Sequence, residues 1–268
     1  MSTYCSTSIR TNLPLDGALK TVAELGFQEI DLLAILAWAH VNPADMADHF
    51  SDTVSNVEKA LAKHSLNIRA MNTGTNQQLH DRTTEGIARR NIELDALCRF
   101  MNHFGVKVAA IQPLQKDWDR EWRPVIDDCL LTLKEQFAIG EKFGIQFALE
   151  MHAHSPIETL EQAEYLLDKM PNIPLVYDPT HFIMLGKSIK DSEWLIANAV
   201  HVHLRDAAKE KMQTHMGEGD VDFNYLFEVL KRKNYQGNFS IEYLHSDELD
   251  ILEDVKILRD EITKFYPN

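Results

Sequence analysis

The segment G-I-Q-F-A-L-E-M-H at residues 144–152 says most about the architecture, because it joins a helix end to a strand that closes on a charged residue. Gly144 follows the apolar-periodic segment 120–143, and a glycine at this point commonly ends a helix. Residues 145–149 form a largely apolar run, typical of a strand covered on both faces of a parallel sheet. Glu150 ends that run. The segment predicts a helix, a parallel strand and a carboxylate at the carboxyl end of the strand.

The same alternation recurs along the whole chain. Helical segments at 15–25 and 84–104 are also followed by glycine. The runs with strand character are residues 4–9, 27–33, 67–71, 106–112, 145–150, 175–178, 200–204 and 238–243. Eight strand–helix units in 268 residues give about 33 residues per unit, close to the spacing of a barrel of ~250 residues. The sequence predicts an α/β fold, a single (β/α)8 TIM barrel, with residues 1–268 as one domain.

A doubly wound open sheet is the alternative fold. It is disfavoured because no G-x-G-x-x-G motif follows the first strand, where a dinucleotide-binding fold would place one.

The composition of the chain limits the classes of partner that it is expected to bind. The chain has 27 Lys and Arg against 41 Asp and Glu, a formal net charge of −14, which argues against nucleic acid or anionic lipid as a partner. Its three cysteines, Cys5, Cys98 and Cys129, are too scattered for a disulfide framework. Residues 1–10 lack the layout of a signal peptide, and no stretch reaches ~18 apolar residues. We expect a cytoplasmic protein with a small-molecule partner; a homo-oligomer is left open.

Titratable residues stand at the ends of the last four predicted strands: Glu150, Asp178, His203 and Glu242. Each alone has an ordinary explanation, such as an ion pair, a helix cap or a hydrogen-bonded core histidine. In a barrel, however, the four ends lie side by side at one rim. Three carboxylates gathered there would repel one another unless a cation neutralised them. Oxygen ligands with one imidazole suit one divalent ion, Mn²⁺, Mg²⁺, Co²⁺ or Zn²⁺.

Two further histidines are placed by strand geometry. His201 and His203 are two residues apart and share one face of their strand, so only His203, nearer the carboxyl end, is expected to reach the rim. His201 is interpreted as a packed barrel residue. Pro179 ends the strand before it, which predicts that His181 lies on the following loop and faces the same pocket.

At this point the sequence resembles the xylose-isomerase-like TIM barrel superfamily, and within it the sugar phosphate isomerase/epimerase branch. The segments that carry the resemblance are G-F-Q-E-I-D at 26–31, L-E-M-H at 149–152, V-Y-D-P-T-H at 176–181, H-V-H-L-R-D at 201–206, G-E-G-D-V-D-F at 217–223 and I-E-Y at 241–243. The resemblance implies that Glu150, Asp178, His203 and Glu242 hold the metal ion. It also implies that the two glutamates are the acid/base pair.

The resemblance also bears on substrate binding. It implies that His181 contacts substrate, and both Arg205 and Lys209 lie near the position of a substrate-binding arginine. His152 and Gln112 are further candidates. Arg205 has a second interpretation, an ion pair with Asp206 at the strand end.

The apurinic-site endonucleases of the same superfamily hold three zinc ions, and this chain departs from them. Asn72 and Gln112 stand where extra histidine ligands would be needed, and His215 alone does not replace the missing Asp-x-His pair. Together with the negative charge, this favours one metal ion and a small substrate.

The expected activity is a metal-dependent isomerase or epimerase acting on a ketose or related hydroxy-ketone sugar through a metal-stabilised enediolate. The alternatives are a metal-dependent dehydratase or lyase of a cyclic polyol or keto acid and, further away, a phosphodiester hydrolase. A sugar- or metal-binding barrel without turnover is the non-catalytic alternative. Trp38, His40 and Glu218 are weaker candidates for the pocket wall.

Overall fold

Eight parallel strands form a closed barrel in the computed structural model, which describes residues 1–36 and 38–267. In barrel order they are β1 (Thr3–Ser6), β2 (Glu29–Ile35), β4 (Asn67–Gly74), β5 (Val108–Ile111), β6 (Gln146–Glu150), β7 (Leu175–Tyr177), β8 (Ala199–Leu204) and β9 (Asn238–Ile241). Strand β1 pairs with both β2 and β9, which closes the ring. Strand β3 (Ala39–His40) adds an antiparallel pair to β2. The (β/α)8 prediction is confirmed.

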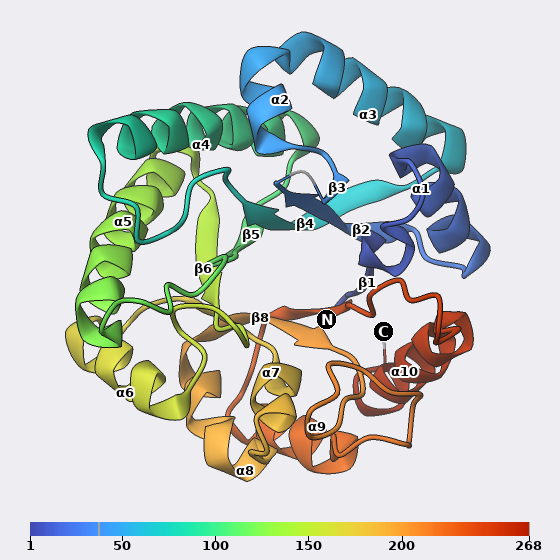
Figure 1. The fold of residues 1–268 in the computed structure, drawn as a ribbon. Coiled ribbons are helices and arrows are strands. Elements are labelled where there is room, and N and C mark those ends of the chain that lie inside the picture. Colours follow the sequence, from blue (N-terminus) through green and yellow to red (C-terminus); the bar gives the residue numbers. More distant parts are fainter. Residues whose placement is uncertain (37, 268) are drawn as a thin grey trace.

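The helices surround the barrel as an outer ring (Figure 1). They are α1 (Leu15–Glu24), α2 (Pro43–Asp48), α3 (Phe50–His64), α4 (Thr84–Phe104), α5 (Trp122–Phe143), α6 (Leu160–Lys169), α7 (Pro179–Met184), α8 (Ile189–Ser192), α9 (Phe223–Arg232) and α10 (Leu252–Phe265), with 3₁₀ turns at Thr7–Arg10 and Glu193–Asn198. Gly105 and Gly144 end α4 and α5 in the left-handed conformation, with φ of 71° and 66°, as the sequence predicted.

The apolar core has two parts. The larger one lies between the strands and the helices, where Phe100, Leu133 and Phe147 are among the buried side chains. A small cluster of Ala110, Ala148 and Val176 lies apart from it. Glu150 is two residues beyond Ala148 and therefore points to the same side of β6. The small cluster thus lies below the carboxyl ends of β5–β7.

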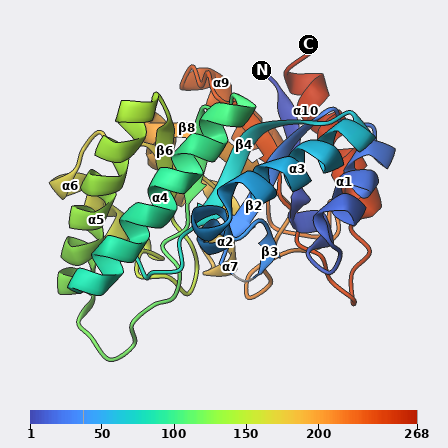
Figure 2. The ribbon, with the colours of Figure 1, turned by 90° about the horizontal axis from the view of Figure 1, so that it is seen from above.

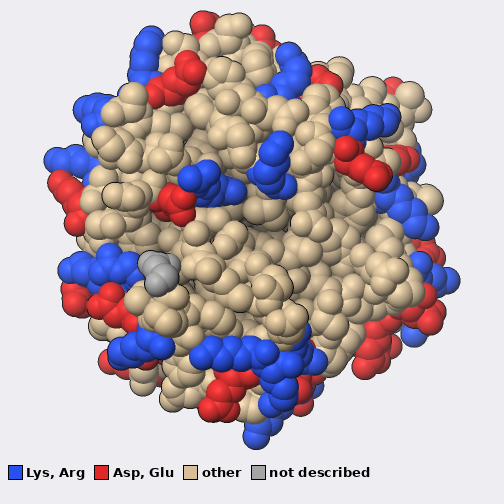
Figure 3. Space-filling view, turned by 180° about the vertical axis from the view of Figure 1, so that it is seen from behind, with Lys and Arg blue, Asp and Glu red and all other residues tan. Residues whose placement is uncertain are grey.

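The two ends of the barrel differ. Both chain termini lie at one end, and α7 and β3 lie at the other (Figure 2). At the terminal end, Lys and Arg side chains alternate with Asp and Glu around the edge, and the middle is largely uncharged (Figure 3). No helix in the described part of the chain is long and apolar enough to cross a membrane.

Candidate metal centre and active site

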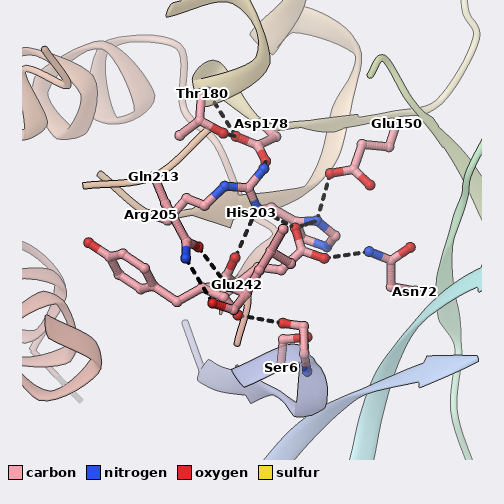
Figure 4. Close-up of polar contacts among 12 residues, drawn as sticks. Ser6, Asn72, Glu150, Asp178, Thr180, His203, Arg205, Gln213 and Glu242 are labelled. Atoms are coloured by element: carbon pink, nitrogen blue, oxygen red, sulfur yellow. Dashed lines mark hydrogen bonds and ion pairs between the residues drawn. The ribbon is translucent and has the colours of Figure 1, made fainter. Parts of the chain in front are cut away.

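Four buried side chains converge at the carboxyl ends of neighbouring strands β6 to β9 (Figure 4). Glu150 is the last residue of β6, Asp178 directly follows β7, His203 lies in β8 and Glu242 directly follows β9. One ligand atom from each lies within 4.8 Å of the others. The structure therefore brings together all four residues that the sequence analysis selected as metal ligands.

His203 stands at the centre of the group. Its Nδ1 lies 2.9 Å from Glu150 Oε1 and 3.1 Å from Glu242 Oε2. Asp178 Oδ1 caps helix α7 by accepting hydrogen bonds from the amide (2.8 Å) and hydroxyl (2.5 Å) of Thr180. The other oxygen of Asp178, Oδ2, is buried and faces a cationic group, because Arg205 Nη2 lies 3.0 Å from it. A buried carboxylate oxygen requires such a positively charged partner.

Arg205, which follows β8, supplies the only guanidinium of the group among the described residues. Its Nη2 lies 3.0 Å from Asp178 Oδ2 and its Nη1 lies 3.0 Å from Glu242 Oε2. Three carboxylates and one guanidinium leave two negative charges in excess when His203 is neutral. A single divalent cation would balance them, and this is the charge that the donor set fits.

Burial and neighbouring charges give the two glutamates, Glu150 and Glu242, different pKa values. Burial raises the pKa of Glu150 to about 7, and the negative charge of Glu242 adds to this effect. Burial acts on Glu242 in the same direction, but the charges of His203 and Arg205 outweigh it and lower the pKa of Glu242 to about 2. The pKa of His203 is raised well above its usual value, against its burial, by Glu242 and Glu150. The two glutamates thus differ in protonation near neutral pH.

Asp31 in β2 is a functional candidate that the sequence analysis did not single out. Its Oδ2 lies 3.4 Å from Nε2 of His203 and 3.4 Å from Nε2 of His201. A carboxylate next to Nε2 of His203 favours the tautomer whose Nδ1 is free to bind a metal ion. His201 stacks on Tyr4 one layer deeper, as expected of a packed barrel residue. The available signal was one acidic residue inside the apolar strand E-I-D-L-L-A-I.

A cavity of about 270 Å³ opens onto the group. Asn72, Arg205 and Glu242 are its most buried polar lining, and Asn72 Nδ2 donates to Glu242 Oε1 at 2.5 Å. Gln112 also lines the cavity and donates to Glu150 Oε2. Glu242 thus borders the cavity, whereas Glu150 lies behind Gln112. Asn72 and Gln112 serve as hydrogen-bond donors to the glutamates at the positions where a trinuclear site would need histidines.

The predicted substrate contacts have mixed outcomes. His152 lines the cavity, and the ring of His181 packs against it at 3.9 Å between centroids. His181 lies on helix α7 and not on a loop, because Pro179 begins that helix at its first position. It is buried and lies 3.4 Å from Asp178 Oδ2, but it is outside the lining of the cavity.

Two further sequence interpretations, on Lys209 and on Arg205, need correction. Lys209 is exposed, lies beside Gly186 and does not line the cavity, so it is not placed to bind substrate there. Arg205 does not pair with Asp206. The carboxylate of Asp206 instead accepts the amides of Gly217 (2.8 Å) and Gly219 (3.2 Å) and so holds the following loop.

Of the three weaker candidates for the pocket wall, one lines the cavity and two do not. Trp38 lines the cavity. Glu218 is exposed, so it does not point inward. His40 lies 3.1 Å from Thr7 Oγ1 and 3.0 Å from the Arg10 carbonyl, outside the cavity lining.

Comparison with known proteins agrees with this architecture. The family model described as xylose isomerase-like TIM barrel matches residues 19–262. The chain belongs to the xylose isomerase-like TIM barrel family. An inosose dehydratase of Clostridium perfringens is 26% identical over 145 residues, which are 46% of this chain and 48% of that protein. The chain spans about half the length of the curated relatives that it matches first.

Solved structures share the whole fold of this chain. A D-allulose 3-epimerase from Methylomonas sp. superposes with a TM-score of 0.76 at 15% identity, covering 99% of this chain and 98% of its own. The IolI protein with a bound zinc atom superposes with a TM-score of 0.73 at 19% identity, covering 100% of both chains. At these identities the likeness establishes the fold.

Proposed function

We propose that this protein is a divalent-metal-dependent isomerase or epimerase of a small hydroxy-ketone sugar. The observation that carries the proposal is the buried group of Glu150, Asp178, His203 and Glu242, which together with Arg205 has two negative charges in excess and so calls for one divalent cation. The zinc in the IolI structure and the epimerase activity named for the Methylomonas protein support it.

The residues fit one Mn²⁺, Co²⁺, Mg²⁺ or Zn²⁺ ion, held by the three carboxylates and Nδ1 of His203. When bound, such an ion supplies Lewis-acid polarisation of a substrate carbonyl and so acidifies the neighbouring C–H. Asp31 holds the His203 ring from the other side. Arg205 fixes the carboxylates of Asp178 and Glu242 in place.

Glu242 and Glu150 are proposed as the proton-transfer pair. Glu242 borders the cavity, so it is placed to accept a proton from the substrate carbon. Glu150 lies on the other side of His203, 2.9 Å from its Nδ1, and is proposed to return the proton. The two lie on strands separated by β7 and β8 and therefore approach a bound substrate from different sides. Proton return to the opposite face gives epimerisation, and return to the neighbouring carbon gives isomerisation.

Dehydration is the second candidate, and the similarity to inosose dehydratase favours it. The same C–H would be removed first, and loss of a neighbouring hydroxyl would follow. His152 is a half-buried imidazole at the cavity wall and is proposed to contact that hydroxyl.

The test is to load the protein with Mn²⁺ or Co²⁺ and incubate it with a panel of ketoses and inososes in D₂O. Nuclear magnetic resonance detects deuterium at individual carbons and so identifies the carbon that exchanges its proton. Deuterium in a product that keeps every hydroxyl group of the substrate supports isomerisation or epimerisation. A product that has lost one molecule of water supports dehydration. Glu242→Gln should abolish exchange, and Glu141→Gln, an exposed position at the end of α5, should leave it unchanged. Unchanged exchange in Glu242→Gln would refute the assignment.

A further inference from the structure

Two exposed polar side chains, Gln115 and His154, line the outer part of the cavity. Within the described part of the chain, both residues form hydrogen bonds through their backbones alone. The deeper polar side chains differ, because Asn72, Gln112 and Arg205 all donate to carboxylates of the metal centre. Gln115 and His154 therefore have hydrogen-bonding capacity to offer a substrate.

The backbone at both positions has a rare conformation. His154 has a φ of 65°, and Leu114, directly before Gln115, has a φ of 59°. Both angles lie in the left-handed region, which residues other than glycine seldom adopt. Such a conformation persists only where surrounding contacts hold it, and it is common at binding sites. One of those contacts joins the two turns, because the Lys116 amide donates to the His154 carbonyl at 3.0 Å.

An ion pair also joins the two loops that carry these residues. The ammonium of Lys116, on the loop after β5, pairs with Oε1 of Glu158, on the loop after β6. The second oxygen of Glu158, Oε2, accepts the amide of His154 at 2.9 Å. The Trp118 ring, whose centroid lies 4.4 Å from the same ammonium, adds a cation–π contact. Glu158 is buried, so salt screens this pair less than it screens an exposed one.

The loop after β4 also supports Gln115. Gln78, on that loop, accepts the amide of Gln115 at its Oε1, at 3.0 Å. The carbonyl of Gln78 in turn accepts Nη1 of Arg90 at 3.0 Å, and Arg90 is a buried residue of helix α4. Three neighbouring loops are thus joined at the outer edge of the cavity, and Gln115 and His154 belong to this junction.

We infer that Gln115 and His154 determine substrate specificity by binding the hydroxyl groups at the end of the sugar remote from the metal centre. The Lys116–Glu158 ion pair positions both residues. An amide and a neutral imidazole can each donate and accept a hydrogen bond, as a hydroxyl group does. The inference rests on the proposed function for the orientation of the sugar, with its carbonyl end at Glu242, because the cavity extends from Glu242 to these two residues.

The experiment compares fructose and the shorter ketose dihydroxyacetone as probes of the Mn²⁺-loaded protein. Both offer a carbonyl and a neighbouring hydroxyl to the metal centre, but only fructose carries further hydroxyl groups towards the outer cavity. Calorimetry measures binding, and deuterium incorporation in D₂O measures proton exchange.

The first two variants each remove one side chain of the pair. Gln115→Ala removes the amide, and His154→Gly removes the imidazole while suiting the left-handed backbone. Each should weaken fructose binding about three- to tenfold, which corresponds to the loss of one hydrogen bond. The binding of dihydroxyacetone should weaken by less than about twofold, because this probe lacks the remote hydroxyl groups.

Two further variants test the ion pair. Glu158→Gln keeps an oxygen for the His154 amide but removes the charge, and Lys116→Met removes the ammonium. Each should weaken fructose binding about three- to tenfold while the affinity for Mn²⁺ and the exchange rate at saturating fructose stay unchanged, whereas a general loss of structure would lower all three. Lys116→Arg keeps the cation and should bind fructose as the wild type does. Lys142→Met, an exposed lysine of α5, is the control and should change none of these measurements.

The outcomes separate the inference from the proposed function. Equal losses for fructose and dihydroxyacetone, unchanged fructose binding in Gln115→Ala and His154→Gly, or no binding of fructose to the wild type would each overturn the inference. Unchanged fructose binding in both Glu158→Gln and Lys116→Met would overturn the positioning role of the ion pair. The expected pattern of binding without proton exchange for either probe would support the inference and count against the isomerase or epimerase reaction. Proton exchange with both probes, without any loss of fructose binding in the variants, would support the reaction and overturn the inference.

Discussion

In the metal-free protein, the stabilisation that Glu150 gives should disappear as the pH rises from 5 to 8.5, whereas His152, His181 and His201, whose pKa values burial lowers, act in the opposite direction. Burial raises the pKa of Glu150 from 4.5 to about 7, so the folded state holds a proton that the unfolded chain has released. A raised carboxyl pKa stabilises the fold fully below pH 4.5, and this contribution disappears as the pH passes through 7. The sign is opposite to that of ordinary acid denaturation.

The magnitude follows from the size of the shift. At 1.36 kcal/mol per pKa unit, the loss between pH 5 and 8.5 is on the order of 3 kcal/mol. For a chain of this size that corresponds to roughly 6–12 °C in the melting temperature. His203 adds to the loss in the same direction, because its pKa is raised by the glutamates and the stabilisation it gives fades as the pH rises through that pKa.

The assay is urea unfolding of chelator-treated protein across this pH range, for the wild type, Glu150→Gln and the exposed control Glu141→Gln. The neutral amide cannot ionise, so the free energy of unfolding of Glu150→Gln should fall less steeply with pH than that of the wild type. The free energy of unfolding of Glu141→Gln should follow the wild type. At pH 8.5, Mn²⁺ at a hundred times its Kd should raise the free energy of unfolding of the wild type by about 2.7 kcal/mol. It should raise that of Glu150→Gln by much less. Parallel curves for the wild type and Glu150→Gln would refute the reasoning.

Three other changes test other parts of the structure. Asp31→Asn should weaken Mn²⁺ binding about 10–100-fold by calorimetry while the circular dichroism spectrum is unchanged, because it loosens the hold on Nε2 of His203; unaltered affinity would remove Asp31 from the site. Arg205→Met should destabilise the metal-free protein to urea by about 3–5 kcal/mol, since it removes the guanidinium that pairs with the buried carboxylates of Asp178 and Glu242, and Mn²⁺ should recover more stability in it than in the wild type. Gly140→Ala should cost about 1–3 kcal/mol in urea despite the better helix propensity of alanine, because its Cβ would lie 2.5 Å from Cδ2 of Phe147 and 2.9 Å from the Ile145 carbonyl; a stabilised variant would contradict that packing.

The sequence predicted the barrel well because its signals are local. Glycines after helices and short apolar runs mark each unit, and parallel closure then places all strand ends at one rim. The convergence of Glu150, Asp178, His203 and Glu242 followed from that geometry alone. These features need no knowledge of side-chain packing.

The errors came from the connections after the strands. Pro179 was interpreted as a stop, although proline also starts helices, and this displaced His181 from helix to loop. Arg205 and Asp206 are neighbours in an extended segment, so their side chains point to opposite sides and cannot pair. Lys209 lies in a tight turn, closed by the bond from the Ala208 amide to the Lys211 carbonyl, that turns the chain away from the cavity. Such turns depend on contacts that spacing does not encode.

The closure of the ring by β1 and β9 has a consequence for how the protein is made. Glu242 follows the last strand to leave the ribosome, and that strand must pair with the first one before the barrel is complete. A nascent chain that has emerged only as far as β8 can offer three of the four donors, and β1 then has no neighbour on one edge. Metal capture should therefore mark the end of folding, and a cation supplied during synthesis should trap finished barrels while leaving unfinished ones to chaperones.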